Sequence, residues 1–242
     1  MCLAFLRYDP EQPWPVVLLS IRDEELARPT APPSRHWPDT QPALVGGQDL
    51  RSGGTWLAVD TDRNSVAAVF TSGGATPLSS ALRSRGELPL IALRDSGIDG
   101  LDFTSYGPFT LLVADATRAT WWTSTGSGLH RQQIAGGDHI ANVDGLDAVT
   151  GSPRQARWRD PLAVSAPTGF DPTAAASARW NGWPSLLAGG LEPDTRDSLL
   201  LRSGPYGTKS VALIALGAKG ISYDVTEHPT DVTSWTTVLP AG

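Results

Sequence analysis

Two short runs near the start of the chain decide its fold. Residues 2–8 read CLAFLRY and residues 16–21 read VVLLSI, and the segment between them holds three prolines and an aspartate. Large apolar and β-branched residues favour strands, whereas Pro and Asp favour turns. The sequence therefore predicts two strands joined by a turn, with Cys2 at the start of the first strand.

The rest of the chain alternates between similar runs and helix-compatible segments. Strands are predicted over 55–59, 66–71, 109–115, 119–123, 129–134, 209–216 and 221–226, and helical segments over 77–96 and within 171–202. Residues 28–42 contain five prolines, which predicts a loop. This order of strands and helices favours an α+β fold over a doubly wound parallel sheet. Because 242 residues can bury one large core, we expect a single domain over 1–242.

The composition argues against several classes of partner. The 19 basic and 25 acidic residues give a net charge of -6, and no basic block could neutralise successive phosphates. We therefore expect no nucleic-acid partner. Neither a leader pattern nor the roughly 18 apolar residues that cross a bilayer are present. These features predict a soluble cytoplasmic protein without a stable membrane anchor.

Cys2 is the one cysteine of the chain, so it forms neither an intramolecular disulfide nor a thiolate cluster for zinc. The four histidines, His36, His130, His139 and His228, do not lie at metal-ligand spacing. We expect no metal and no cofactor. A lone cysteine is usually a small buried apolar residue, and that interpretation competes with a chemical one.

The chemical interpretation of Cys2 follows from its position. Removal of Met1, which occurs before small side chains, would make Cys2 the N-terminal residue. Its α-amine titrates near ~7.7–8 and its thiol near ~8.5, so the amine could take the thiol proton at neutral pH. Cys2 would then supply both the nucleophile and its base.

Arg22, Asp23 and Glu24 follow the second predicted strand. Antiparallel pairing of the two strands would bring this charged triplet beside Cys2. Since side chains alternate along a strand, Arg22 and Asp23 can both point at Cys2 only where the strand ends or bulges. The alternative is a solvated strand end with a surface ion pair.

Several motifs follow one another along the chain in a known order. They are Met1-Cys2-Leu3, Arg22-Asp23-Glu24, 26–32 (LARPTAP), 47–57 (GQDLRSGGTWL), 84–88 (SRGEL) and 202–210 (RSGPYGTKS). Together they resemble the NRDE family, whose animal members are called transport and Golgi organisation proteins. The resemblance covers nearly the whole chain.

The resemblance implies a four-layer αββα sandwich of the N-terminal-nucleophile (Ntn) hydrolase type. It also implies that Cys2, as the mature N-terminal residue, attacks an amide or ester carbonyl of a small molecule and forms an acyl-enzyme, which water or an amine resolves. Arg22 would stabilise the thiolate and Asp23 would orient the α-amine. Asn142 stands where related amidases have an oxyanion donor, with a turn residue as the alternative.

The resemblance also implies a set of residues that line a substrate pocket. These are Arg28, Trp56, Thr71, Ser72, Tyr206 and Lys209. For Trp56 the pattern favours the alternative of a core position, because so large a strand side chain is most readily placed inside. Three positions depart from the family pattern: Ile21 and Ser72 replace Asn, and Lys209 replaces Arg and loses its planar fork. The first two changes alter the polar lining of the pocket.

The alternative function is that of a carrier, which would bind a ligand in the same pocket without catalysing a reaction. The resemblance also points to haem or acyl-coenzyme A and lipid trafficking, for which the scattered histidines provide no evident axial ligand. A Ser-His-Asp hydrolase is excluded because the chain has no Gly-x-Ser-x-Gly elbow. Exposed strand edges and nine Trp residues would suit a homodimer.

Overall fold

The computed structural model of the chain describes residues 2–72, 82–190 and 197–240. Two compact units account for it: Met1–Ala27 together with Gly136–Gly242, and Arg28–Ala135. Each unit contains one antiparallel sheet and a few helices, so the chain is a mixed α/β protein. The two units are described separately.

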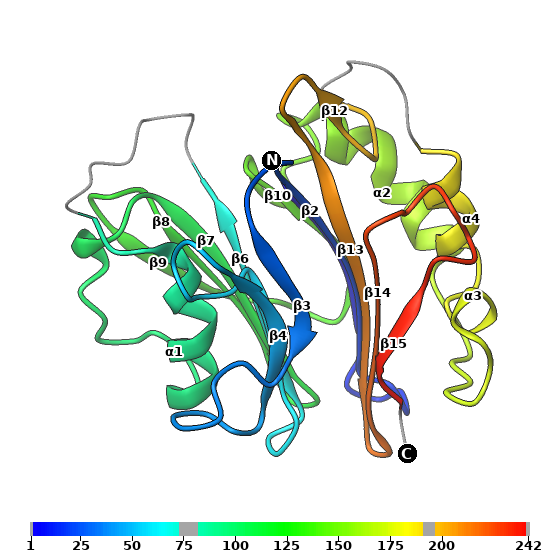
Figure 1. Cartoon of the computed structure of the whole chain (residues 1–242), viewed down its shortest axis with the longest axis horizontal. Coiled ribbons are helices and arrows are strands. Elements are labelled where there is room, and N and C mark those ends of the chain that lie inside the picture. The colour runs from blue at the N-terminus through cyan, green and yellow to red at the C-terminus, as the bar shows by residue number, and fades with distance from the viewer. Residues whose placement is uncertain (1, 73–81, 191–196, 241–242) are drawn as a thin grey trace. The chain divides into compact units, whose positions relative to one another are not determined.

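The first unit is built on the sheet β11-β10-β1-β2-β13-β14-β15, with β12 paired to β13 (Figure 1). Its strands are β1 (Leu3–Tyr8), β2 (Val16–Glu25), β10 (Gly137–Asn142), β11 (Gly145–Leu146), β12 (Arg202–Ser203), β13 (Tyr206–Gly217), β14 (Gly220–Thr226) and β15 (Thr236–Leu239). The predicted hairpin of the opening runs is confirmed, because β1 and β2 pair antiparallel with Leu3 opposite Ile21. The predicted C-terminal hairpin is also confirmed as β13 and β14.

Three helices, α2 (Pro153–Ser165), α3 (Ala176–Arg179) and α4 (Trp183–Ala188), cover one face of this sheet (Figure 1). The core between them takes alternate residues of β1, β2 and β13, including Leu3 and Phe5 of β1, and the helix residues Leu162 and Trp183. No helix is predicted from the sequence over 153–165. α2 nevertheless begins where Ser152 accepts the backbone N–H of Gln155 and Pro153 occupies the first turn, as is common at helix starts.

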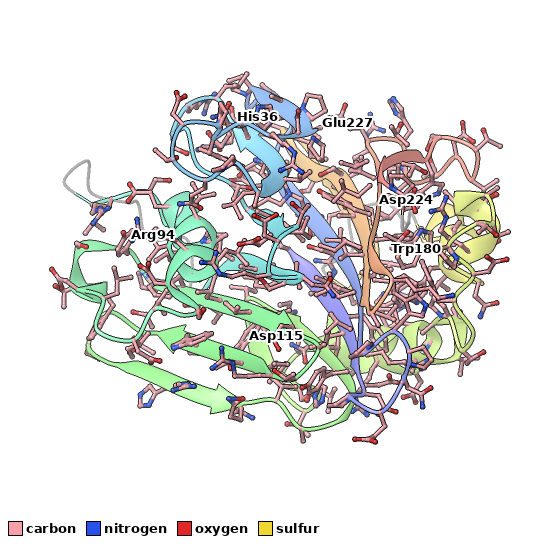
Figure 2. The ribbon with its side chains drawn as sticks, turned by 90° about the horizontal axis from the view of Figure 1, so that it is seen from below. His36, Arg94, Asp115, Trp180, Asp224 and Glu227 are labelled. Carbon is pink, nitrogen blue, oxygen red and sulfur yellow. The ribbon has the colours of Figure 1, made fainter. Side chains whose placement is uncertain are left out.

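A polar group is enclosed between α3 and β14. Asp224 is fully buried, and it accepts hydrogen bonds from Trp180 Nε1 and Thr237 Oγ1, both at 2.6 Å. The guanidinium of Arg179 lies 3.6 Å from the same carboxylate and donates to Ser222 Oγ at 3.2 Å. In Figure 2, Trp180 and Asp224 are labelled at this junction. The carboxylate therefore joins the helical layer to the sheet.

The second unit is built on the sheet β3-β4-β5-β6-β7-β8-β9. Its strands are β3 (Thr30–Ser34), β4 (Leu44–Asp49), β5 (Leu57–Asp60), β6 (Ser65–Thr71), β7 (Phe109–Asp115), β8 (Ala119–Ser124) and β9 (Leu129–Gln133). The strands predicted within 55–134 are confirmed. The loop predicted over 28–42 is wrong in part, because β3 lies inside it. β3 is an edge strand whose register shifts between Ala31 and Ser34, and such positions tolerate proline.

A helical segment packs on one face of this second sheet. It consists of η1 (Arg85–Glu87) and α1 (Leu88–Asp95), with η2 (Phe103–Ser105) following. The helix predicted over 77–96 is therefore confirmed only for its later part, and residues 77–81 of that prediction lie outside the described residues. Leu88, Ala92 and Leu93 of α1 join the core of the unit.

The glycine pairs of the motif at 47–57 have a packing role. A Cβ on Gly47 would lie 2.4 Å from the ring of Trp56, and one on Gly54 would lie 2.5 Å from the backbone of Gly86. A side chain at either glycine would overlap these atoms, so the motif lets a tryptophan and a neighbouring turn approach the backbone closely.

None of the helices among the described residues has the length and apolar character that a bilayer crossing demands.

Candidate functional site

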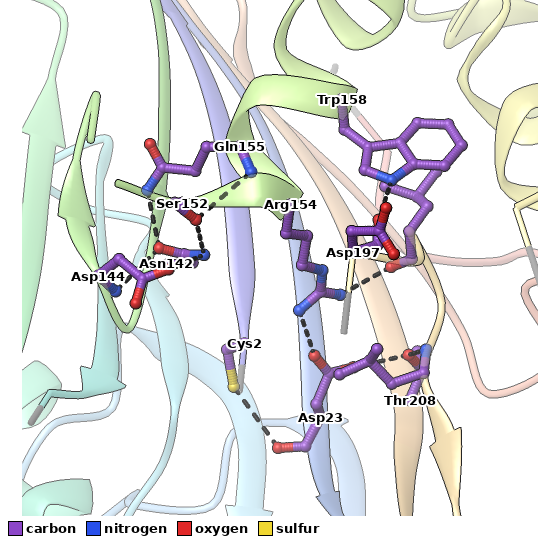
Figure 3. A network of polar contacts seen from close by, with 12 residues as sticks. Cys2, Asp23, Asn142, Asp144, Ser152, Arg154, Gln155, Trp158, Asp197 and Thr208 are labelled. Atoms are coloured by element: carbon purple, nitrogen blue, oxygen red, sulfur yellow. Dashed lines mark hydrogen bonds and ion pairs between the residues drawn. The ribbon is translucent and has the colours of Figure 1, made fainter. Parts of the chain in front are cut away.

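Cys2 lies at the start of β1, one residue before the paired positions Leu3 and Ile21. Continuing this register places Cys2 beside Arg22, on the same face of the sheet. The Cys2 thiol donates a hydrogen bond to the backbone carbonyl of Asp23, with 3.7 Å between Sγ and O (Figure 3). The structure thus brings the predicted cysteine and the predicted Arg-Asp pair together within one unit.

The surroundings of Cys2 raise the pKa of its thiol, mainly through burial. Cys2 is half-buried. Burial raises the pKa of its thiol above the ordinary value, and the negative charge of Asp23 acts in the same direction, whereas the positive charge of Arg22 lowers it. The thiol of Cys2 is therefore harder to deprotonate than a thiol exposed to water.

Arg22 and Asp23 point to opposite faces of β2, because the strand continues to Glu25 without interruption. Arg22 is buried, and its guanidinium lies 3.6 Å from the carboxylate of Glu24, two residues on and on the same face. The condition under which both side chains would point at Cys2, an end or a bulge in the strand at this point, is therefore not met in β2. A register shift lies instead in the neighbouring strand β13, between Thr208 and Ser210. Asp23 consequently offers Cys2 its backbone carbonyl, while its carboxylate faces the helices.

The carboxylate of Asp23 lies in a buried network that the sequence did not predict. Arg154 of α2 donates to its Oδ2 at 2.8 Å, and Thr208 of β13 donates to its Oδ1 at 2.6 Å (Figure 3). The second guanidinium nitrogen of Arg154 donates to the Leu199 carbonyl at 2.7 Å. The side chains of Arg154 and Asp23 are 3% and 1% exposed, so the ion pair is shielded from solvent.

Asn142 lies opposite Leu3 and on the helix-facing side of the sheet. Its amide nitrogen donates to Ser152 Oγ at 2.9 Å and to Asp144 Oδ2 at 3.1 Å, while its oxygen accepts from Gln155 Nε2 at 2.7 Å (Figure 3). Both amide protons are engaged in these contacts. In this arrangement Asn142 ties β10 to the start of α2, and the predicted donation to an oxyanion beside Cys2 stays a prediction.

Tyr206 and Lys209 contact the end of β2 and the residues just after it. The Tyr206 hydroxyl donates to Glu24 Oε1 at 3.4 Å, and Lys209 Nζ donates to the Leu26 carbonyl at 2.9 Å. Lys209 stands at the β13 bulge. These two residues of the late motif are therefore placed around the charged triplet.

The remaining predicted pocket residues belong to the second unit. The Trp56 ring packs over Gly47, and Ser72, which follows Thr71 at the end of β6, donates to the Ser124 carbonyl at 3.2 Å. Arg28 forms an ion pair with Asp49. Asp49 also accepts the backbone N–H groups of Arg51 and Ser52, at 2.9 and 3.1 Å, and so closes the turn of the motif at 47–57.

The Arg28–Asp49 pair is expected to make stability depend on pH. Burial alone would raise the pKa of Asp49, but Arg28 and the two backbone N–H groups hold it below its usual range. The resulting stabilisation, about 1–2 kcal/mol, is complete above the unfolded pKa of about 3.9 and is lost as pH falls through the folded pKa. Urea unfolding at pH 7 and pH 3 should show Asp49→Asn less stable than the parent at pH 7, with a smaller difference at pH 3. An equal difference at both pH values would contradict this account.

Among the described residues, no group of three or more His, Cys, Asp or Glu side chains could hold a metal ion.

Fold and site together define a mixed α/β protein with two antiparallel sheets and a cysteine site at its N-terminus. The model of the family Transport and Golgi organisation 2, which is the NRDE family, matches residues 1–150. The chain therefore belongs to this family. No individual curated protein matches the chain. Arg154 and Thr208 lie beyond the matched residues.

Proposed function

We propose that the protein is an Ntn-type cysteine hydrolase or acyl transferase that forms an acyl-enzyme on Cys2 with a small amide, ester or thioester. One observation carries this proposal: the thiol of residue 2, just before the central strand β1, hydrogen-bonds to the carbonyl of Asp23, which follows the buried Arg22. Membership of the NRDE family is consistent with it.

The proposed chemistry starts after Met1 is removed. The free α-amine of Cys2 takes the thiol proton, and the thiolate attacks the substrate carbonyl carbon to form a tetrahedral intermediate. The carbonyl re-forms as the bond to the leaving group breaks, and the leaving group takes a proton. Water or an amine then attacks the thioester and releases Cys2. Arg22 stabilises the thiolate by its charge, in line with its lowering of the thiol pKa.

For the whole chain, 1–242, we propose the four-layer αββα plan of Ntn hydrolases. Its support is that each unit combines one antiparallel sheet with helices packed on one face. As part of the same proposal, six residues bind the substrate: Arg28, Trp56, Thr71, Ser72, Tyr206 and Lys209.

The test is acylation followed by intact-mass measurement. Purified protein should lack Met1, and treatment with p-nitrophenyl acetate should add one acetyl group, which Cys2→Ala should abolish. Cys2→Ser should label far more slowly, because an alkoxide is harder to form than a thiolate. Equal labelling of the Ala variant would reject Cys2 as the nucleophile. Absence of labelling in the parent, with Met1 removed, would favour the haem or acyl-coenzyme A carrier.

A further inference from the structure

Two separate segments of the chain converge on the side chain of Asp23. Arg154 reaches it from α2, and Thr208 reaches it from β13, so each carboxylate oxygen has a donor of its own. Thr208 Oγ1 in turn accepts the backbone N–H of Leu201 at 2.9 Å, and Arg154 holds the carbonyl of Leu199. A carboxylate held at both oxygens fixes the rotamer of Asp23 and restricts its backbone.

The backbone that is held in this way belongs to the residue that accepts the hydrogen bond of the Cys2 thiol. We propose that Arg154 and Thr208 are positioning residues for Cys2 and act on it through Asp23. This inference rests on the proposed function of Cys2 as a nucleophile. Neither residue lies within the family match over 1–150, and neither touches the sulfur in the contacts described above.

The charges of Asp23 and Arg154 also act on the sulfur of Cys2. Besides burial, the negative charge of Asp23 raises the pKa of the Cys2 thiol. Arg154 places a positive charge 2.8 Å from that carboxylate in a site that excludes water, where charges interact strongly. Loss of Arg154 would leave the carboxylate uncompensated and make the thiolate harder to form.

Alkylation of Cys2 by iodoacetamide tests this proposal without requiring turnover. Cys2 is the one cysteine of the chain, so the intact mass reports its reaction once the slower reaction of amines, measured on Cys2→Ala, is subtracted. Rates are measured from pH 6 to 10 on protein that has lost Met1. The variants are Arg154→Met, Thr208→Val, and Thr208→Ser, which restores the hydroxyl. Arg157→Met is the control: Arg157 lies on the same helix but is 37% exposed and pairs with Asp197 at 3.1 Å.

We expect Arg154→Met to slow alkylation at pH 7.5 by about tenfold, with the pH profile moved up by about one unit. Thr208→Val should slow it several-fold, Thr208→Ser should recover most of the rate, and Arg157→Met should match the parent. Thermal melting confirms that each variant is folded. Should Arg154→Met unfold, the Val and Ser variants of Thr208 decide the question. Profiles of folded Thr208→Val and Arg154→Met that match the parent would overturn the inference.

The outcomes also separate this inference from the proposed function. A parent protein that alkylates with a profile sensitive to Arg154 and Thr208, but does not acylate, would retain the positioning role and reject the enzyme. A parent that acylates with no such sensitivity would retain the enzyme and reject the positioning role.

Discussion

A chain that keeps an extra residue in front of Cys2 is expected to acylate its thiol about 10²–10⁴ times more slowly than a chain that begins at Cys2. Burial and the charge of Asp23 raise the pKa of the thiol, so little thiolate forms at neutral pH without a base. In the extended chain, the nitrogen of Cys2 is an amide and cannot accept the thiol proton. The sulfur stays in place but loses the base that is proposed to activate it.

The comparison can be made with a single preparation. A cleavable N-terminal extension keeps Cys2 blocked, and cleavage immediately before Cys2 produces the free amine in the same sample. Acetylation by p-nitrophenyl acetate is followed by intact mass before and after cleavage, and thermal melting shows whether the fold is unchanged. Equal rates in the two forms would show that the amine is not the base, even if Cys2 is the nucleophile.

The parts of the fold that could be predicted are those in which apolar runs and turn residues indicate the same element. β1 and β2 combine apolar runs with a proline-rich turn, and β13 and β14 meet at a glycine-flanked turn. β3 was missed because its prolines indicate a loop unless the strand is known to lie at a sheet edge. α2 was missed because its sequence, PRQARWRDPLAVS, is strongly polar and contains Pro161. Contacts from Trp158 and Leu162 to the core stabilise it instead.

Which residues form the candidate site could be predicted better than how their side chains are arranged. Position in the sequence and family motifs identified Cys2 and Arg22, and strand pairing brought them together. The direction of the Asp23 carboxylate depends on strand alternation continuing through the charged triplet, which the motif does not specify. Arg154 is 131 residues from Asp23 and carries no local signal, since any arginine on a polar helix resembles it. Long-range ion pairs of this kind follow from the packed structure alone.

Asp224 is a second charged residue whose buried partners cannot be predicted from the sequence. β14 alternates Ile221, Tyr223 and Val225 with Ser222 and Asp224, which would ordinarily place the polar set in solvent. In the structure Ser222 and Asp224 are fully buried beneath the helices. A buried carboxylate is stable there only because donors surround it.

Asp224→Asn is therefore expected to lower the free energy of unfolding by about 3–5 kcal/mol. The amide keeps the shape of the side chain, but it removes the charge opposite Arg179 and can direct an N–H at Trp180 Nε1 or Thr237 Oγ1, where an acceptor is needed. Urea unfolding, followed by the fluorescence of the nine tryptophans of the chain, measures the loss in global stability. Asp231→Asn, at an exposed carboxylate that accepts from Thr233, is the matched control and should change stability far less. Comparable losses in the two variants would show that the buried carboxylate does not hold the helical layer to the sheet. A large loss confined to Asp224→Asn would show that a charge buried beneath the helices stabilises this layer through its partners.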